Sequence, residues 1–241
     1  MFVGKKAIIF DMDGTLIDSV GVWNTVDVQI INQFGSKKAP SEKEMGHERD
    51  QVTAANRSDP NPYMTYCEHL RVKYGCHIDA ASIHSIRYEW AKNYLIHSID
   101  YKPGAEQFIK ALKQRGLILA IASATKKANL EIYRDLNENL KLKAPLEVYF
   151  SLIYGREDAL RMKPDPYIYQ RVIKELKVKP EETLVFEDSL IGIQAARAAG
   201  IETVAIYDQY ADHEHEAIKA LADHYIENYG QALKTLQKDW P

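Results

Sequence analysis

Short runs of apolar residues recur along the chain, and each run ends in polar or small residues. The runs are continuous rather than alternating, which predicts strands that are covered on both faces of a sheet. Segments with helical periodicity, such as residues 104–116 and 165–178, lie between the runs. This alternation is typical of an α/β fold with a doubly wound parallel sheet. The four clearest strands are expected at Ala7–Phe10, Leu117–Ala122, Leu184–Phe186 and Thr203–Ile206.

Weaker signals complete the predicted sheet. A fifth strand is expected within Glu147–Gly155, and a last short one near His224–Asn228. The helix over residues 165–178 has a start signal, with Asp165 as its N-cap and Pro166 at its first helical position. The elements fit a Rossmann-like arrangement with the strand order 3-2-1-4-5, in which the first strand is central.

Residues 20–96 interrupt the alternation of strand and helix. They show helical periodicity and contain no convincing strand. We therefore expect an all-helical domain inserted into an α/β core made of residues 1–19 and 97–241. A length of 241 residues, of which 46% are hydrophobic, is sufficient for one large domain or two unequal domains.

Composition narrows the classes of partner. Charged residues make up 27% of the chain and the net charge of -3 is spread without long blocks, so no nucleic-acid surface is indicated. No stretch is apolar enough to span a membrane, and Cys67 and Cys76 lack CxxC spacing. We expect a soluble cytoplasmic protein with reduced thiols, a monomer or weak dimer, which acts on a small molecule.

Polar side chains that could take part in catalysis or ligand binding follow three of the predicted strands. The first strand runs into Asp11 and Asp13, the second into Ser123, and the fourth into Glu187 and Asp188. In a doubly wound sheet, ligands bind beyond the carboxyl ends of the strands where the order reverses. Residues two apart in an extended segment point the same way, so both aspartates could face this crevice.

Crowded carboxylates repel each other, and the usual remedy is a bound cation or a shared proton. Oxygen ligands favour Mg²⁺, which takes one or two carboxylates together with a substrate phosphate. Ser123 and Lys163 would supply a hydroxyl and a positive charge for the phosphate oxygens. The sequence therefore predicts a site for Mg²⁺ and a small phosphorylated metabolite.

Four segments in this order resemble the haloacid dehalogenase superfamily, whose phosphatases use an aspartate nucleophile. They are DMDGT (Asp11–Thr15), IASAT (Ile121–Thr125), MKPDP (Met162–Pro166) and VFEDSLIGIQAARAAG (Val185–Gly200). Their order and spacing cover the whole predicted core. The resemblance implies an insert called a cap after the first strand, which is the place that residues 20–96 occupy.

The resemblance also implies a role for each polar residue. Asp11 would attack phosphorus and become an aspartyl phosphate, while Asp13 would protonate the leaving oxygen and later accept a proton from water. Ser123 and Lys163 would hold the phosphoryl oxygens. The implied Mg²⁺ ligands are Asp11, the main-chain oxygen of Asp13, Asp188 and, directly or through water, Glu187.

The insert is similar to the cap of β-phosphoglucomutase and of related sugar-phosphate phosphatases. In the segment MGHERD, Gly46 and Arg49 match a cap loop that faces the active site in those enzymes. Arg49 could contact a sugar hydroxyl or a second phosphate, or be a solvated helix arginine. Trp23 stands where the mutase has a histidine, which favours a phosphatase, although simple packing would also explain it. Ala124 and Lys126 are further candidates for substrate binding.

The leading prediction is a Mg²⁺-dependent phosphatase that acts on a hexose or deoxyhexose phosphate through an aspartyl phosphate. A mutase-type sugar-phosphate isomerase is the alternative, because it differs only in returning the phosphoryl group. A non-enzymatic phospho-acceptor regulator would share most of these residues but has no need of a second acid such as Asp13. A true dehalogenase would have no use for the Mg²⁺ ligands.

Overall fold

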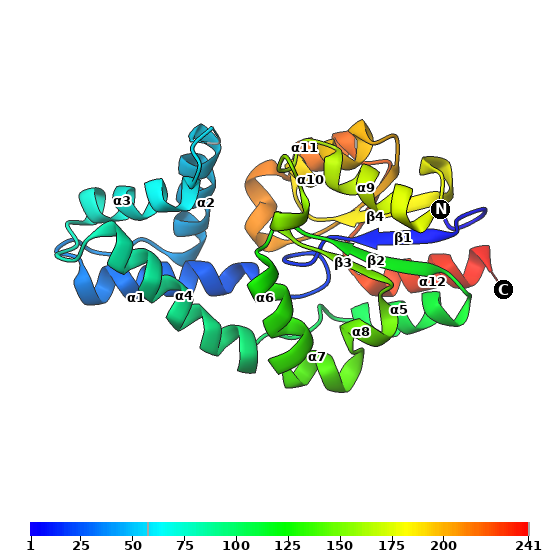
Figure 1. The fold of residues 1–241 in the computed structure, drawn as a ribbon, viewed down its shortest axis with the longest axis horizontal. Helices are drawn as coiled ribbons and strands as arrows, with labels where there is room; N and C mark the ends of the chain where they lie inside the picture. Colours follow the sequence, from blue (N-terminus) through cyan, green and yellow to red (C-terminus); the bar gives the residue numbers. More distant parts are fainter. Residues whose placement is uncertain (57, 241) are drawn as a thin grey trace. The chain divides into compact units, whose positions relative to one another are not determined.

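The computed structural model describes residues 1–56 and 58–240. The chain divides into two compact units: Met1–Asp18 together with Ile99–Pro241, and Ser19–Ser98 (Figure 1). We call them the α/β unit and the helical unit. The predicted domain boundaries after residues 19 and 96 differ from these by one and two residues.

The α/β unit is built on one sheet of six parallel strands in the order β3-β2-β1-β4-β5-β6. This confirms the predicted doubly wound sheet with β1 at its centre, and β6 extends it by one strand at the edge. The strands are β1 (Ala7–Phe10), β2 (Ile118–Ala122), β3 (Leu152–Tyr154), β4 (Thr183–Glu187), β5 (Glu202–Ile206) and β6 (His224–Ile226).

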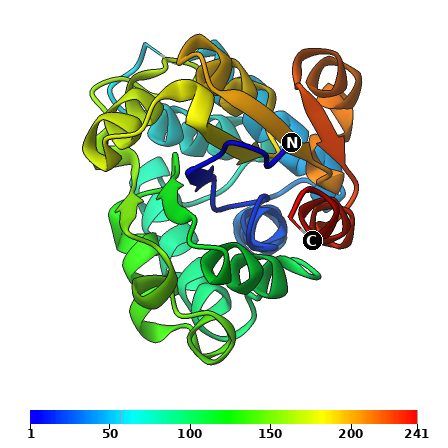
Figure 2. The same ribbon diagram turned by 90° about the vertical axis from the view of Figure 1, so that its right-hand side faces the viewer.

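Helices cover both faces of the sheet, with α5 and α12 on one face and α9 and α10 on the other (Figures 1 and 2). Short helical turns lie in the loops between these helices and the strands. The helices and turns are α5 (Ala105–Gln114), α6 (Lys127–Glu131), the π-helix η1 (Ile132–Leu136), α7 (Glu138–Lys143), α8 (Leu146–Tyr149), η2 (Arg156–Asp158), α9 (Tyr167–Leu176), η3 (Pro180–Glu182), α10 (Leu190–Ala198), η4 (Gln209–Glu214), α11 (His215–Leu221) and α12 (Tyr229–Asp239).

The continuous apolar runs of the strands are explained by this two-sided cover. Every residue of β1 and β4 is buried. On one face Phe10 stacks on Phe186, with ring centroids 5.0 Å apart, and Phe108 of α5 packs against both. On the other face Ile9 belongs to a separate buried cluster with Tyr169 of α9. Burial on both sides leaves the strand tips as the place where polar residues can gather.

Two local predictions need correction. The strand expected within Glu147–Gly155 forms only at β3, because the residues before it make the helical turn α8, which Pro145 precedes as the N-cap. Helix α9 begins at Tyr167 rather than at Pro166, which is the N-cap residue. The side chain of Asp165 still accepts the main-chain N–H of Tyr167 at 3.0 Å, the bond expected of an N-cap, so only the start of the helix lies one residue later than predicted.

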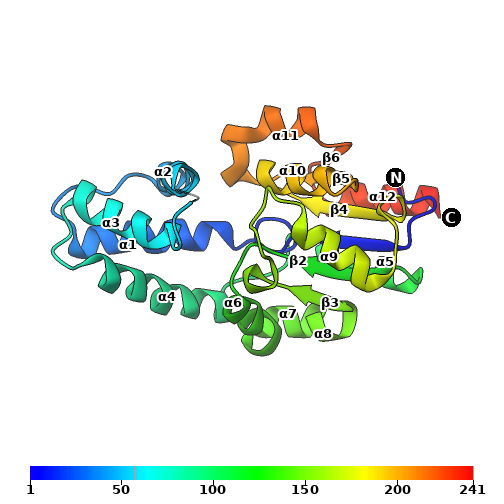
Figure 3. The same ribbon diagram turned by 45° about the horizontal axis from the view of Figure 1, so that its top comes forward.

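The helical unit consists of α1 (Val20–Phe34), α2 (Glu42–Ala55), α3 (Pro62–Tyr74) and α4 (Ala80–His97) (Figure 3). Side chains cap three of the four helix starts, which satisfies main-chain N–H groups there. Cys67 and Cys76 are buried free cysteines in this unit. Within the described part of the chain, no helix is long and apolar enough to cross a membrane.

Candidate active site

The carboxyl ends of β1, β2 and β4 bring the predicted polar residues of the α/β unit together. Phe10 of β1 pairs with Ile121 of β2 and with Phe186 of β4, so Asp11 lies between the ends of its two neighbours. One oxygen from each of Asp11, Glu187 and Asp188 lies within 4.8 Å of the others. The three residues are buried, which makes this a closely spaced carboxylate cluster with little access to bulk water.

Lys163 joins this cluster as its counter-charge. Its Nζ donates to Oδ1 of Asp11 at 2.7 Å, to Oε1 of Glu187 at 2.6 Å and to the main-chain oxygen of Ala122 at 2.9 Å. These bonds use all three donors of a buried ammonium group. Lys163 is therefore fixed against the carboxylate at the tip of the central strand.

Glu187 is the most heavily bonded member of the cluster. Its Oε1 accepts from Lys163 and from the Tyr169 hydroxyl at 3.0 Å. Its Oε2 accepts from two successive main-chain N–H groups and from Oγ of Ser189 at 2.9 Å. A side chain at Gly192 would place its Cβ 1.8 Å from Oε1, so this glycine is required by close approach. Glu187 thus ties Lys163 to the start of α10.

Asp188 has a different environment. Its Oδ1 accepts a hydrogen bond from Oγ1 of Thr15 at 2.6 Å, and both residues are buried. Burial raises the pKa of Asp188 well above its usual range, and the nearby charges of Glu187 and Asp208 raise it further. This carboxyl group is held by a neutral donor and is only weakly compensated by charge.

Burial and the neighbouring charges also shift the pKa values of Asp11 and Lys163. Burial raises the pKa of Asp11 to about 7, an effect that Lys163 opposes and Glu187 reinforces. Burial lowers the pKa of Lys163, but Asp11 and Glu187 outweigh this and hold it well above its usual range. Lys163 pairs with only two of the three buried carboxyl groups, and carboxylate oxygens are hard ligands. The cluster therefore fits a hard divalent cation, which would allow all three acids to be ionised.

Asp13 follows Asp11 on the same strand extension but is bonded to another element. Gly14, with a φ of 82°, turns the chain immediately after it, and its N–H donates to the main-chain oxygen of Ile17 at 3.0 Å. Oδ1 of Asp13 accepts a hydrogen bond from the Tyr133 hydroxyl at 2.7 Å. Asp13 is partly exposed, in contrast to buried Asp11. The two acids thus have separate partners.

Ser123 lies at the end of β2 as predicted. It is buried, its N–H donates to the main-chain oxygen of Tyr154 at 2.9 Å, and its Oγ accepts the N–H of Thr125 at 3.1 Å. Ala124 is exposed and Lys126 is partly exposed at the start of α6. The hydroxyl is therefore fixed by the backbone, whereas the two neighbouring candidates lie toward the surface.

The predicted cap residues Trp23, Gly46 and Arg49 lie in the helical unit. Gly46 and Arg49 both contact Asn24 there. Gly46 of α2 packs so closely on Asn24 of α1 that a Cβ would lie 2.7 Å from Nδ2. Nη1 of Arg49 donates to Oδ1 of the same Asn24 at 2.8 Å, and Arg49 is only 8% exposed. The interpretation of Arg49 as a solvated helix arginine is therefore wrong. Trp23 packs edge-on against Tyr88, with ring centroids 5.4 Å apart.

Sequence reasoning missed Thr15, Tyr133 and Tyr169. Thr15 lies inside the segment DMDGT, so its hydroxyl could have been assigned to the same strand end. Tyr133 and Tyr169 carry no such signal, because aromatic residues in helices usually indicate packing. Their hydroxyl groups reach Asp13 and Glu187 only through the folding of distant segments.

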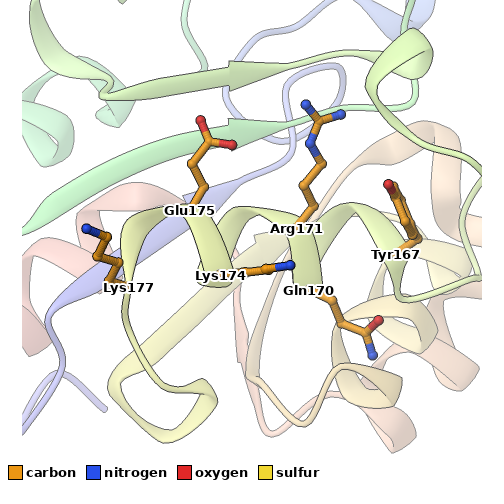
Figure 4. Close-up of a pocket in the computed structure, with 6 residues that line it drawn as sticks. All are labelled: Tyr167, Gln170, Arg171, Lys174, Glu175 and Lys177. Atoms are coloured by element: carbon orange, nitrogen blue, oxygen red, sulfur yellow. The ribbon is translucent and has the colours of Figure 1, made fainter.

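A surface pocket of about 650 Å³ lies elsewhere on the α/β unit. Figure 4 shows its lining side chains along α9 and at its C-cap: Tyr167, Gln170, Arg171, Lys174, Glu175 and Lys177. Nη1 of Arg171 is bonded to the main-chain oxygen of Asp158 at 2.6 Å, and its guanidinium lies over the Tyr154 ring. The pocket includes none of the predicted site residues, so we do not place the chemistry there.

Comparison with known proteins identifies the family of the chain. The profile of the haloacid dehalogenase-like hydrolases matches residues 5–200, so the chain belongs to that family. The phosphorylated carbohydrates phosphatase of Thermotoga maritima is 29% identical over 199 residues, which cover 83% of this chain and 83% of that protein. The predicted resemblance to this superfamily is confirmed.

Solved structures share the fold. A mutant of CbbY from Rhodobacter sphaeroides, in complex with xylulose-(1,5)bisphosphate, superposes with a TM-score of 0.70 at 24% identity, covering 94% of this chain and 96% of that chain. β-Phosphoglucomutase from Clostridium difficile gives a TM-score of 0.67 at 18% identity, covering 98% and 96%. At these identities the likeness concerns the fold.

Proposed function

We propose that this hydrolase is a Mg²⁺-dependent phosphatase that cleaves a sugar phosphate through an aspartyl phosphate on Asp11. Its family and its phosphatase relatives identify it as a phosphatase. The metal, the covalent intermediate and the substrate are the proposed parts. The observation that carries them is the buried bond between Lys163 and Oδ1 of Asp11, beside two further carboxylates.

The proposed reaction has two steps. Asp11 attacks phosphorus through Oδ2, because Oδ1 is already bonded to Lys163. The phosphorus–oxygen bond to the sugar breaks, and the leaving oxygen takes the proton of Asp13. Water then attacks the aspartyl phosphate, Asp13 recovers a proton from that water, and inorganic phosphate leaves with Asp11 restored. Ser123 holds a phosphoryl oxygen during both steps, and Lys163 does so by exchanging one of its three bonds for a phosphoryl oxygen.

Asp11, Asp188 and the main-chain oxygen of Asp13 would hold Mg²⁺. Bound there, the ion would offset charge on the phosphoryl group and keep Asp11 ionised. We assign Glu187 a supporting role, because both of its carboxylate oxygens already accept hydrogen bonds from protein donors. It positions Lys163 and can reach the ion through water.

We propose a hexose or deoxyhexose phosphate as the substrate. The support comes from the Thermotoga maritima relative, whose name specifies phosphorylated carbohydrates. The helical unit offers Arg49, which Asn24 holds in place, as a group that could read a sugar hydroxyl. Gly46 permits the close approach of α1 and α2 that this contact needs. Trp23, Ala124 and Lys126 remain candidates for additional contacts.

The test is a phosphate-release screen over sugar phosphates, nucleotides and phosphoglycolate, with Mg²⁺ and with a chelator. We expect release that requires Mg²⁺ and is fastest with a hexose or deoxyhexose phosphate. Interconversion of sugar phosphates without phosphate release would instead identify a mutase. Full activity in chelator would contradict the proposed metal. Stoichiometric labelling without turnover would indicate a phospho-acceptor.

A further inference from the structure

Tyr133 is a buried residue whose hydroxyl is directed at a charged partner. It is 0% exposed, and its hydroxyl donates to Oδ1 of Asp13 at 2.7 Å. The two residues are 120 positions apart in the chain, so the contact does not arise from local structure. A buried tyrosine usually gives its hydroxyl to some partner, but here the partner is the acid beside Asp11.

The backbone that carries Tyr133 is unusual and firmly held. Residues 132–136 form the π-helix η1 between α6 and α7. Asn137 closes this turn with its N–H bonded to the main-chain oxygen of Ile132 at 2.9 Å. The buried Asn137 side chain also donates to the oxygen of Ile99 and accepts the N–H of Leu140, both at 3.0 Å. Single π-turns widen a helix locally and often occur at functional sites.

Each of the two acids at the tip of β1 has one oxygen held by a donor from a distant element. Lys163 holds Oδ1 of Asp11, and Tyr133 holds Oδ1 of Asp13. The charged donor suits an acid that must stay ionised to attack. A neutral hydroxyl suits an acid that alternates between carrying and lacking a proton, because it can bond to either form.

We propose that Tyr133 is a positioning residue for proton transfer by Asp13, an inference that rests on the proposed function. By holding Oδ1, the hydroxyl orients the carboxyl group so that Oδ2 carries the transferred proton. In the first step this proton moves from Oδ2 to the sugar oxygen as the phosphorus–oxygen bond breaks. In the second step Oδ2 takes a proton from the attacking water. Tyr133 itself neither gains nor loses a proton.

The test compares leaving groups in the variant Tyr133→Phe, which removes only the hydroxyl. A sugar alkoxide leaves poorly without a proton, whereas p-nitrophenolate leaves readily without one. We expect kcat/KM for the sugar phosphate to fall about tenfold, a part of the usual contribution of general acid catalysis. For p-nitrophenyl phosphate it should stay within about twofold, because that leaving group needs little help from an acid. The ratio between the two substrates is therefore the decisive quantity.

Tyr101→Phe is the matched control. The Tyr101 hydroxyl also forms a buried hydrogen bond in the α/β unit, to the main-chain oxygen of Ala144 rather than to Asp13. Its removal should leave the ratio between the two substrates unchanged. Should Tyr133→Phe not fold, Tyr133→Met is measured in the same way, with thermal unfolding reporting that the fold is intact.

A double variant links the effect to Asp13. Tyr133→Phe should cost nothing further in an Asp13→Asn background, since the group that it positions is already absent. Equal losses on both substrates, no loss on either, or full additivity with Asp13→Asn would overturn the proposal. Failure of the proposed function gives a different result, because the wild type would then release no phosphate from the sugar phosphate or would release it unchanged in chelator.

Discussion

The α/β unit and the helical unit both bury charged side chains, but they balance them differently. In the α/β unit, Lys163 pairs with Asp11 and Glu187, while the third carboxyl group of the cluster, that of Asp188, accepts a hydrogen bond from the neutral hydroxyl of Thr15. In the helical unit, Arg87 of α4 and Asp27 of α1 are buried as a matched pair. The Arg87 guanidinium also lies over the rings of Trp23 and Tyr66.

The difference in charge balance distinguishes a candidate active site from a buried ion pair that only supports packing. A matched buried pair satisfies its own charges, so it can fix how helices pack without requiring any other partner. An unmatched group of carboxylates keeps a demand for positive charge, which a metal ion and a phosphoryl-transfer site can use. The comparison supports the proposed chemistry in the α/β unit and a packing role for the buried pair in the helical unit.

The largest expected effect is that of Asp11→Asn. This change keeps the shape of the side chain but removes the attacking oxygen charge, so phosphate release should fall to background while the protein remains folded. Turnover is measured with the preferred sugar phosphate, and folding by circular dichroism. Retention of activity within about tenfold of wild type would rule out Asp11 as the nucleophile.

Replacing the buried basic side chain of each unit, Lys163 or Arg87, tests this comparison. Breaking a buried ion pair by deleting one partner typically costs about 3–5 kcal/mol, so Lys163→Met and Arg87→Met should both destabilise the protein in chelator. Mg²⁺ should recover part of the loss in Lys163→Met, because the ion can offset the remaining carboxylates. In Arg87→Met the carboxylate cluster is intact, so Mg²⁺ should stabilise this variant only as much as it stabilises the wild type and leave the loss relative to the wild type unchanged, because Asp27 is left without its cationic partner.

The measurement is urea unfolding of both variants with Mg²⁺ and with chelator. With the wild type measured alongside, a loss relative to the wild type that shrinks to the same extent in both variants would show that Mg²⁺ acts generally rather than at the carboxylate cluster. An absence of recovery in Lys163→Met would remove the support for a cation at that cluster.

Arg49→Ala should lower kcat/KM for a sugar phosphate but not for an aryl phosphate, which separates an effect on sugar recognition from one on phosphoryl transfer. If Arg49 reads the sugar, its loss removes a charged hydrogen bond of about 1.5–3 kcal/mol, or about ten- to a hundredfold in kcat/KM. Hydrolysis of a small aryl phosphate should hardly change, since that substrate lacks the groups that Arg49 would contact. Steady-state kinetics on the two substrates measures this division.

Arg71→Ala is the matched control, because Arg71 on α3 is bonded to Glu68 at the surface of the same unit. It should affect neither substrate. Equal losses on both substrates in Arg49→Ala would mean that Arg49 supports the phosphate or the fold of α2. An unchanged kcat/KM on both would exclude it from recognition.

The smallest expected effect is a change in the pH dependence of stability. Burial raises the pKa of Asp11 from 3.8 to about 7, so in this range the folded protein binds more protons there than the unfolded chain. The contribution of Asp11 is therefore fully present below pH 3.8 and is lost as the pH rises toward 7. In chelator, the free energy of unfolding of the wild type should fall over this window relative to that of Asp11→Asn.

Equilibrium unfolding at several pH values gives the two slopes. Bound Mg²⁺ should flatten the difference, because a cation keeps Asp11 ionised in the folded protein. Parallel curves for the wild type and Asp11→Asn in chelator would contradict the raised pKa.

Local sequence determined much of the α/β unit. The apolar runs of β1 and β4 were predictable because strands buried on both faces cannot carry polar residues except at their tips. The acids and Ser123 at those tips followed from the parallel order of the strands, which places carboxyl ends together. The helical turn α8 was not predictable, because a short apolar run suits either a strand or a helix.

Only the tertiary structure decided which tyrosine hydroxyls donate hydrogen bonds to Asp13 and Glu187. The bonds of Tyr133 to Asp13 and of Tyr169 to Glu187 join helices to strand ends, and nothing in the sequence near either tyrosine specifies such a partner. The burial of Arg49 against Asn24 likewise depends on the packing of α2 on α1. A sequence pattern records the periodicity of its own segment, whereas these hydrogen bonds require two segments to meet at about 3 Å in a fixed orientation.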